Sequence, residues 1–219
     1  MGSDLKATVE LPLFHGISDQ DRAALLGCLK TYSRSYKKGA YIHLEQDHVQ
    51  DVGIVCSGLV HMLKEDVWGR LTLLAYMGPG ELFGETSALC GERAGHVSFL
   101  AAEDTEVLFL PLDHVLTPCK KQCDFHAAVS RNLCAMLGEN NLKLMEKIEI
   151  AAKGSLREKI LAYLSVQSQR QGSKYITVPL NRTEMANFLH ANRSAMSREL
   201  TSMQADGLIE FDGNTFVLK

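Results

Sequence analysis

Apolar residues recur every three or four positions from Asp124 to about Lys153, and this pattern predicts one long amphipathic helix. The stretch contains one glycine, Gly138, and no proline. A helix of roughly 28 residues is about 40 Å long, which is more than a small domain needs for cover. We therefore expect its apolar stripe to pack against a second copy of the chain; the alternative is a helix that packs only on its own domain. The apolar positions are Phe125, Val129, Leu133, Met136, Leu137, Leu144 and Ile148.

From about Tyr36 to Leu112 the pattern changes to short β-rich runs that are separated by glycines. One run extends from Gly53 to Leu63 and another from Leu71 to Met77, and Trp68-Gly69-Arg70 between them predicts a hairpin turn. Regular turns of this kind are typical of an antiparallel barrel or sandwich. The glycines are Gly39, Gly53, Gly58, Gly69, Gly78, Gly80, Gly84, Gly91 and Gly95.

Polar capping residues mark where shorter helices begin. Ser18 to Asp21 can cap a short helix near the N-terminus. Gly154 breaks the long helix, and Ser155 to Glu158 restarts a helix with a capping-box pattern, which Asn181 to Glu184 repeats. We take Gly154 as the hinge. The predicted domains are residues 1–123, residues 124–153, which form the long helix, and residues 154–219.

Two short helices joined by a tight turn are predicted in the last domain. The first covers Thr183 to Leu189 and the second Asn192 to Leu200, which is the pattern of a helix-turn-helix. His190 lies in the turn, where the chain turns left-handed and glycine is commoner. The second helix begins with a cap at Asn192 and has a polar face that fits a DNA major groove. The candidate DNA contacts are Arg182, Thr183, Asn192, Arg193, Ser194, Ser197 and Arg198.

A β-hairpin is predicted after the second helix. Asp206-Gly207 is typical of a helix C-terminus. Residues from Leu208 to Lys219 contain Asp212-Gly213-Asn214 at their middle, a hairpin-turn sequence. The module is therefore predicted to be a winged helix.

Charge is divided unevenly along the 219 residues, although the net charge is only -3. Residues 151–219 carry nine Lys and Arg against six Asp and Glu, whereas the first 150 residues carry fourteen and twenty. A basic end fits DNA contacts confined to one module, because phosphate neutralisation supplies most non-specific affinity. No apolar run approaches the roughly 20 residues of a membrane span, and the chain starts without a signal-peptide pattern. We expect a cytoplasmic protein with no membrane partner.

The order of β-barrel, long helix and winged helix resembles the Crp/Fnr family of bacterial transcription regulators over nearly the whole chain. The strongest local match is Gly78 to Glu85, which resembles the family's Pro-Gly-(Asp/Glu)-x-x-Gly-Glu signature beneath a small ligand. The resemblance implies an α+β fold: an N-terminal antiparallel, jelly-roll, cyclic-nucleotide-binding-like β-barrel, a dimerisation helix and a C-terminal winged helix-turn-helix. It also implies a homodimeric, sequence-specific DNA-binding regulator, not an enzyme, that is controlled by a small-molecule or redox effector and has RNA polymerase as a further partner.

The resemblance also implies roles within the second helix. Arg198 corresponds to a family arginine that reads guanine, and its guanidinium can contact O6 and N7 together. Ser194 stands where the family often has a glutamate. We therefore expect a palindrome related to the family's usual site, with half-sites about one helical turn apart.

An effector pocket is implied around the signature, but the family's phosphate arginine is missing. In cyclic-AMP-binding members an Arg-Ser or Arg-Thr pair holds the cyclic phosphate, and Gly95-His96 occupies those positions here. Neither residue replaces an arginine fork, and Arg93 lies two positions early. This departure argues against cyclic AMP, so the effector is unknown and no cofactor is predicted. The candidate pocket residues are Gly84, Glu85, Arg93, His96, Asn140 and Asn141.

Asn140 and Asn141 have two interpretations that the sequence leaves open. They fall where the long helix faces the ligand in the family. Alternatively, one of them pairs across the dimer and fixes the register of the two helices.

The six cysteines are expected to be reduced thiols. No cysteine precedes Cys28, so the N-terminal iron-sulfur cysteines of the oxygen-sensing branch are missing. Cys119, Cys123 and Cys134 are either a metal or redox site or small buried hydrophobes. Two other function classes remain: a cyclic-nucleotide-binding module acting on a protein partner, and a jelly-roll metalloenzyme, which would need clustered ligands such as His-x-His.

Overall fold

The computed structural model describes residues 11–90, 95–117 and 124–219. Its contacts separate into two compact units, one ending at Asn140 and the other beginning at Asn141. The sequence predicts domain boundaries at the two ends of the long helix, whereas the division between the units falls inside that helix.

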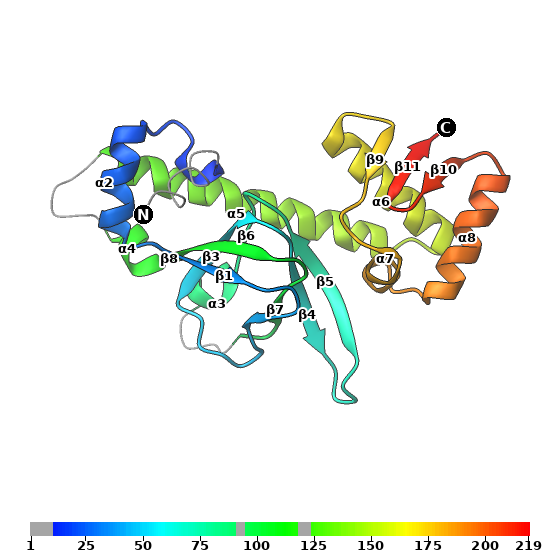
Figure 1. The fold of residues 1–219 in the computed structure, drawn as a ribbon, viewed down its shortest axis with the longest axis horizontal. Coiled ribbons are helices and arrows are strands. Elements are labelled where there is room, and N and C mark those ends of the chain that lie inside the picture. The colour runs from blue at the N-terminus through cyan, green and yellow to red at the C-terminus, as the bar shows by residue number, and fades with distance from the viewer. Residues whose placement is uncertain (1–10, 91–94, 118–123) are drawn as a thin grey trace. The chain divides into compact units, whose positions relative to one another are not determined.

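The first unit is built on two antiparallel four-stranded sheets (Figure 1). One sheet has the order β1-β8-β3-β6 and the other β2-β7-β4-β5, which confirms the antiparallel β-rich domain that the glycine-punctuated pattern predicted. The strands are β1 (Tyr32–Tyr36), β2 (Tyr41–His43), β3 (Asp51–Ser57), β4 (Val60–Glu65), β5 (Leu71–Met77), β6 (Leu82–Phe83), β7 (Ser98–Ala101) and β8 (Thr105–Pro111). The short helices are η1 (Pro12–Phe14), α2 (Asp19–Leu29), α3 (Glu85–Leu89) and α4 (Leu112–Leu116).

The predicted run from Gly53 to Leu63 is two strands, because the chain turns at Gly58. Its φ is +86°, and a Cβ there would lie 2.5 Å from the carbonyl oxygen of Asp104. The predicted hairpin between β4 and β5 is confirmed: the Asp66 N–H donates to the Arg70 carbonyl at 3.0 Å, and Gly69 has a φ of +79°.

The core of the first unit has two parts. One is aromatic and contains Phe83, Phe99 and Phe109. The other joins η1 and α2 to the first half of the long helix α5 (Asp124–Ala151), whose Val129 and Leu133 are buried in it. The helix predicted over residues 124–153 is thus confirmed, ending two residues early. Four apolar side chains in its second half are exposed instead: Leu142, Leu144, Met145 and Ile148.

The second unit is a winged helix-turn-helix, as the sequence predicted. Its helices are α6 (Leu156–Gln171), α7 (Arg182–Phe188) and α8 (Arg193–Ala205). Its antiparallel sheet has the order β10-β11-β9, formed by β9 (Tyr175–Thr177), β10 (Ile209–Asp212) and β11 (Thr215–Leu218) (Figure 1). Within the described ranges, no helix combines the length and apolar character needed to cross a bilayer.

Both predicted capping boxes are present. Ser155 accepts from the Glu158 N–H while the Glu158 carboxylate accepts from the Ser155 N–H. Asn181 and Glu184 make the same reciprocal pair at the start of α7. These local bonds fix where α6 and α7 begin and therefore where the helix-turn-helix lies in the sequence.

Candidate nucleic-acid interface and effector site

The second helix of the motif, α8, begins with a cap that also constrains a candidate DNA contact. Asn192 Oδ1 accepts from the Ser194 N–H at 2.9 Å and from the Ser194 hydroxyl at 2.6 Å. The Ser197 hydroxyl donates to the Arg193 carbonyl at 3.0 Å. Both serines therefore use their donor inside the helix and offer oxygen lone pairs outward, which suits acceptance from the amino groups of adenine or cytosine.

Two arginines give α8 its exposed positive charge. Arg193 and Arg198 are exposed, whereas Met196, Leu200 and Met203 on another side of the helix are buried. Within the part of the chain that the structure describes, neither guanidinium has an ion-pair or hydrogen-bond partner. Both are therefore free to bind phosphate or a base edge.

The turn before α8 is left-handed at His190, whose φ is +53°. This confirms the conformation expected for that position, where glycine is commoner. The His190 N–H donates to the Asn187 carbonyl at 3.0 Å, so the backbone of the turn is tied to α7.

Arg182, a predicted DNA contact, lies against the wing. Its guanidinium donates to the Gly213 carbonyl and stacks on Phe211 and Phe216, with ring centroids 4.9 and 4.7 Å away. Burial lowers the pKa of this guanidinium. Thr183 is exposed, and its N–H is used by the Asn181 cap. Arg182 thus holds the wing to α7, and its contact with DNA stays a prediction.

Lys147, which sequence reasoning missed, ties the end of α5 to α7 within the second unit. Its ammonium group donates to the Phe188 carbonyl and lies 3.3 Å from the centroid of the Phe188 ring. Burial, together with the charge of Lys159, lowers the pKa of Lys147 to about 8. Arg170 of α6 forms an ion pair with Glu146, the neighbouring residue on α5. No local sequence pattern signals these contacts.

In the first unit, three of the predicted pocket residues lie together. Gly84 has a φ of +79° and stands directly before α3. Asn140 Nδ2 donates to Glu85 Oε1 and to the Leu82 carbonyl, both at 3.1 Å. Burial raises the pKa of Glu85, and the Asn140 bond offsets this only in part. The result is a mostly buried carboxyl group at the last residue of the family signature.

The other predicted pocket residues are exposed or lie outside the described residues. Asn141 and His96 are exposed, and the His96 carbonyl accepts from Lys64 at 2.9 Å. Gly95 is buried, with its N–H bonded to the Asp47 carbonyl at 3.1 Å. Arg93 lies outside the described residues, as do Cys119 and Cys123, whereas Cys134 is exposed on α5. In the described ranges, no group of His, Cys, Asp and Glu could hold a metal ion.

Glu85→Gln is expected to raise the melting temperature of the protein near pH 7. Because burial raises the Glu85 pKa, the folded chain binds the carboxyl proton more tightly than the unfolded chain does. The resulting stabilisation is complete below the ordinary pKa of 4.5 and is lost as pH rises through the raised value. Glutamine imitates the protonated carboxyl and still accepts from Asn140.

Thermal melts of both proteins across pH 4 to 8 test this. The gain in Glu85→Gln should shrink as pH falls, whereas the exposed Glu103→Gln control should show no such trend. A gain that is independent of pH would contradict the account.

Comparison with known proteins gives independent support for this architecture. Residues 33–122 match the cyclic nucleotide-binding domain model, and residues 158–219 match the Crp-like helix-turn-helix domain model. The cyclic AMP receptor protein of Thermus thermophilus is 29% identical over 205 residues, which cover 93% of this chain and 90% of the relative. The transcriptional activator protein FnrL of Cereibacter sphaeroides is 22% identical over 209 residues, covering 91% of this chain and 81% of the relative.

A solved structure shares the fold. The c-di-GMP-responsive global regulator CLP of Xanthomonas campestris superposes with a TM-score of 0.71 at 20% identity, covering 90% of this chain and 98% of that chain. The match of the C-terminal unit to a helix-turn-helix domain fits a regulator, and it does not fit a metalloenzyme or a module that acts only on a protein partner. The cyclic nucleotide-binding domain, the long helix and the winged helix follow one another in the order of the family. The chain therefore belongs to the Crp/Fnr family of transcriptional regulators.

Proposed function

We propose that this protein is a homodimeric regulator that reads a palindromic DNA site with α8 and responds to a small-molecule effector at Glu85 and Asn140. The single observation that carries the DNA part is the exposed polar face of α8, on which Arg193 and Arg198 have no partner among the described residues. Purified protein mixed with random duplexes, followed by sequencing of the retained DNA, tests it. A two-fold symmetric motif is expected.

Each side chain of this face has a chemical role in the proposal. Arg198 contacts guanine O6 and N7 with its fork, and Ser194 accepts a hydrogen bond from a neighbouring base. Arg193 holds phosphate or a base edge and sets the position of the helix on the duplex, and Ser197 accepts a hydrogen bond from a base amino group. The wing follows at β10 and β11, where Arg182 fixes its turn to α7.

The second half of α5 supports a homodimer. Asn141, Met145 and Ile148 are exposed and spaced by four and three residues, the spacing of a coiled-coil seam. Asn140 bonds to the first unit whereas Asn141 lies on this exposed stripe. The two interpretations of the pair therefore divide between them: Asn140 serves the effector site, and Asn141 pairs across the dimer to fix register.

The proposed effector is not cyclic AMP, although one relative is named a cyclic AMP receptor protein. The positions for the phosphate-binding pair are a buried glycine and an exposed histidine, and neither supplies a guanidinium. The buried Glu85 carboxylate favours instead an effector that donates hydrogen bonds, such as a hydroxyl or amino compound. A redox effector would have to act through the thiols of Cys119, Cys123 and Cys134. Of these, Cys119 and Cys123 lie outside the described residues.

Isothermal titration with cyclic AMP is expected to give no saturable heat at ligand concentrations up to about 1 mM, because a single lost bidentate phosphate contact removes much of the affinity. Cyclic-AMP binding by the relative from Thermus thermophilus in the same buffer serves as the reference. Saturable binding in the micromolar range would contradict this part of the proposal.

The cellular setting follows from DNA binding. A regulator of transcription works where the chromosome and RNA polymerase are, so we place it in the cytoplasm with RNA polymerase as a further partner. Its relatives are transcription regulators, which supports a non-enzymatic role.

A further inference from the structure

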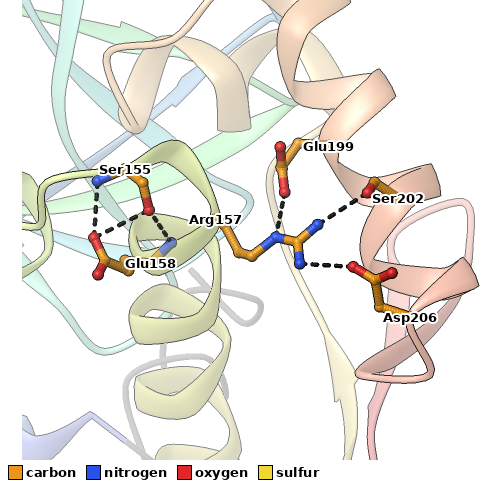
Figure 2. Close-up of polar contacts among 6 residues, drawn as sticks. All are labelled: Ser155, Arg157, Glu158, Glu199, Ser202 and Asp206. Atoms are coloured by element: carbon orange, nitrogen blue, oxygen red, sulfur yellow. Dashed lines mark hydrogen bonds and ion pairs between the residues drawn. The ribbon is translucent and has the colours of Figure 1, made fainter.

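One arginine of α6 holds α8 from the side. Figure 2 shows the guanidinium of Arg157 reaching from α6 to three side chains of the neighbouring helix. Its Nε donates to Glu199 Oε1 at 2.6 Å, its Nη1 to Asp206 Oδ2 at 2.6 Å and its Nη2 to Ser202 Oγ at 2.9 Å. We call these four residues the α6–α8 clamp.

Two charges of the clamp, Arg157 and Asp206, lie at helix ends where the helix dipole disfavours them. Arg157 is in the first turn of α6, and Asp206 is the C-terminal cap of α8. The helix dipole favours anions at a helix N-terminus and cations at a C-terminus, so each charge lies at the end that its own helix disfavours. Pairing them compensates both, and the bonds from Glu199 and Asp206 raise the pKa of Arg157.

The clamp occupies one of three separate faces of α8. With 3.6 residues per turn, positions three or four apart share a face. The clamp face carries Glu199, Ser202 and Asp206, the core face carries Met196, Leu200 and Met203, and the DNA-reading face carries Arg193, Ser194, Ser197 and Arg198. Rotation of α8 about its axis would therefore move the DNA-reading face and strain the clamp together.

The core face alone restrains that rotation weakly. Two of its three buried residues are methionines, whose unbranched side chains adapt to changes in the packing around them. A planar guanidinium with three bonds in fixed directions is a stricter constraint.

We propose that Arg157 is a positioning residue that fixes the rotation of α8 about its axis and thereby orients Arg198 toward the DNA base that it contacts. This role rests on the proposed reading of DNA by α8. It assigns to Arg157 an effect on sequence discrimination without any contact with DNA.

The test measures binding of the full-length protein to its selected palindrome and to a scrambled duplex of equal length, by fluorescence anisotropy over a range of salt concentrations. Arg157→Gln keeps much of the side-chain stem and loses the fork, whereas Arg157→Lys keeps the charge at one point. Arg170→Gln is the matched control, since it removes an ion pair of α6 that does not involve α8. Melting temperatures of all variants are recorded.

Arg157→Gln is expected to weaken binding to the palindrome about tenfold, because the base contact of Arg198 is then poorly oriented. Binding to scrambled DNA and the salt dependence should not change, because no phosphate contact is lost. The palindrome affinity of Arg157→Lys should lie between those of the wild type and Arg157→Gln. Arg170→Gln should keep the wild-type ratio of the affinities for the palindrome and the scrambled duplex.

Two results would overturn the positioning role alone. One is a lower melting temperature with an unchanged affinity ratio, which means that the clamp only stabilises the fold. The other is an equal loss on both duplexes with a smaller salt dependence, which means that Arg157 binds phosphate. Wild-type protein with no preference for any palindrome would overturn the proposed function as well.

Discussion

Arg198→Ala is expected to weaken binding to the preferred palindrome about 30-fold or more, while binding to unrelated DNA changes little. A bidentate arginine-guanine contact is worth about 1–3 kcal/mol, and a dimer loses two of them. The Arg198 side chain is exposed and has no partner among the described residues. It lies on the DNA-reading face of α8, away from the buried core face. Its loss should therefore leave the fold intact. Anisotropy titrations with specific and scrambled duplexes measure both affinities.

Arg198→Lys is the informative companion variant. Lysine keeps the positive charge and loses the planar fork, so non-specific binding should be retained while discrimination at the guanine position falls. Unchanged specific binding in Arg198→Ala would remove α8 from its role as the reader.

Ile148→Lys is expected to convert the dimer into a monomer and to lower affinity for the palindrome about 100-fold or more. Ile148 is 67% exposed on α5 and lies three residues after Met145 and seven after Asn141 on the same exposed stripe. Two lysines facing each other in a seam would repel and would need water. A monomer reaches one half-site at a time and loses the gain from linked binding.

Sedimentation velocity gives the oligomeric state of each variant directly. Glu139→Lys is the control, because it also places a lysine on an exposed part of α5, away from the stripe. A wild-type protein that is monomeric at micromolar concentration, or an Ile148→Lys variant that stays dimeric, would contradict the proposed interface.

The parts of this molecule that the sequence could predict are those set by local chemistry. The starts of α6, α7 and α8 were predictable because Ser155, Asn181 and Asn192 bond to N–H groups two or three residues away. The left-handed turn at His190 was predictable in the same way. These features depend on neighbours in the chain, which a single sequence displays.

Contacts between distant segments were not predictable. Arg182 looks like a DNA contact in sequence, yet its guanidinium stacks on Phe211 and Phe216 of the wing, some 30 positions later. Arg157 gives no sign in sequence that Glu199 and Asp206 are its partners. Asn140 and Asn141 are adjacent in sequence, and only their different directions on the helix give Asn140 its bond to Glu85 and leave Asn141 exposed. Pairings of this kind depend on how the elements pack.

The most direct test of the account is selection of bound sequences from a random duplex library by the purified wild-type protein. The predicted result is one motif with two-fold symmetry, its half-sites about 10 base pairs apart centre to centre, each with a guanine whose enrichment disappears with Arg198→Ala. An asymmetric motif, or no enrichment above the starting library, would contradict a symmetric reader built on α8.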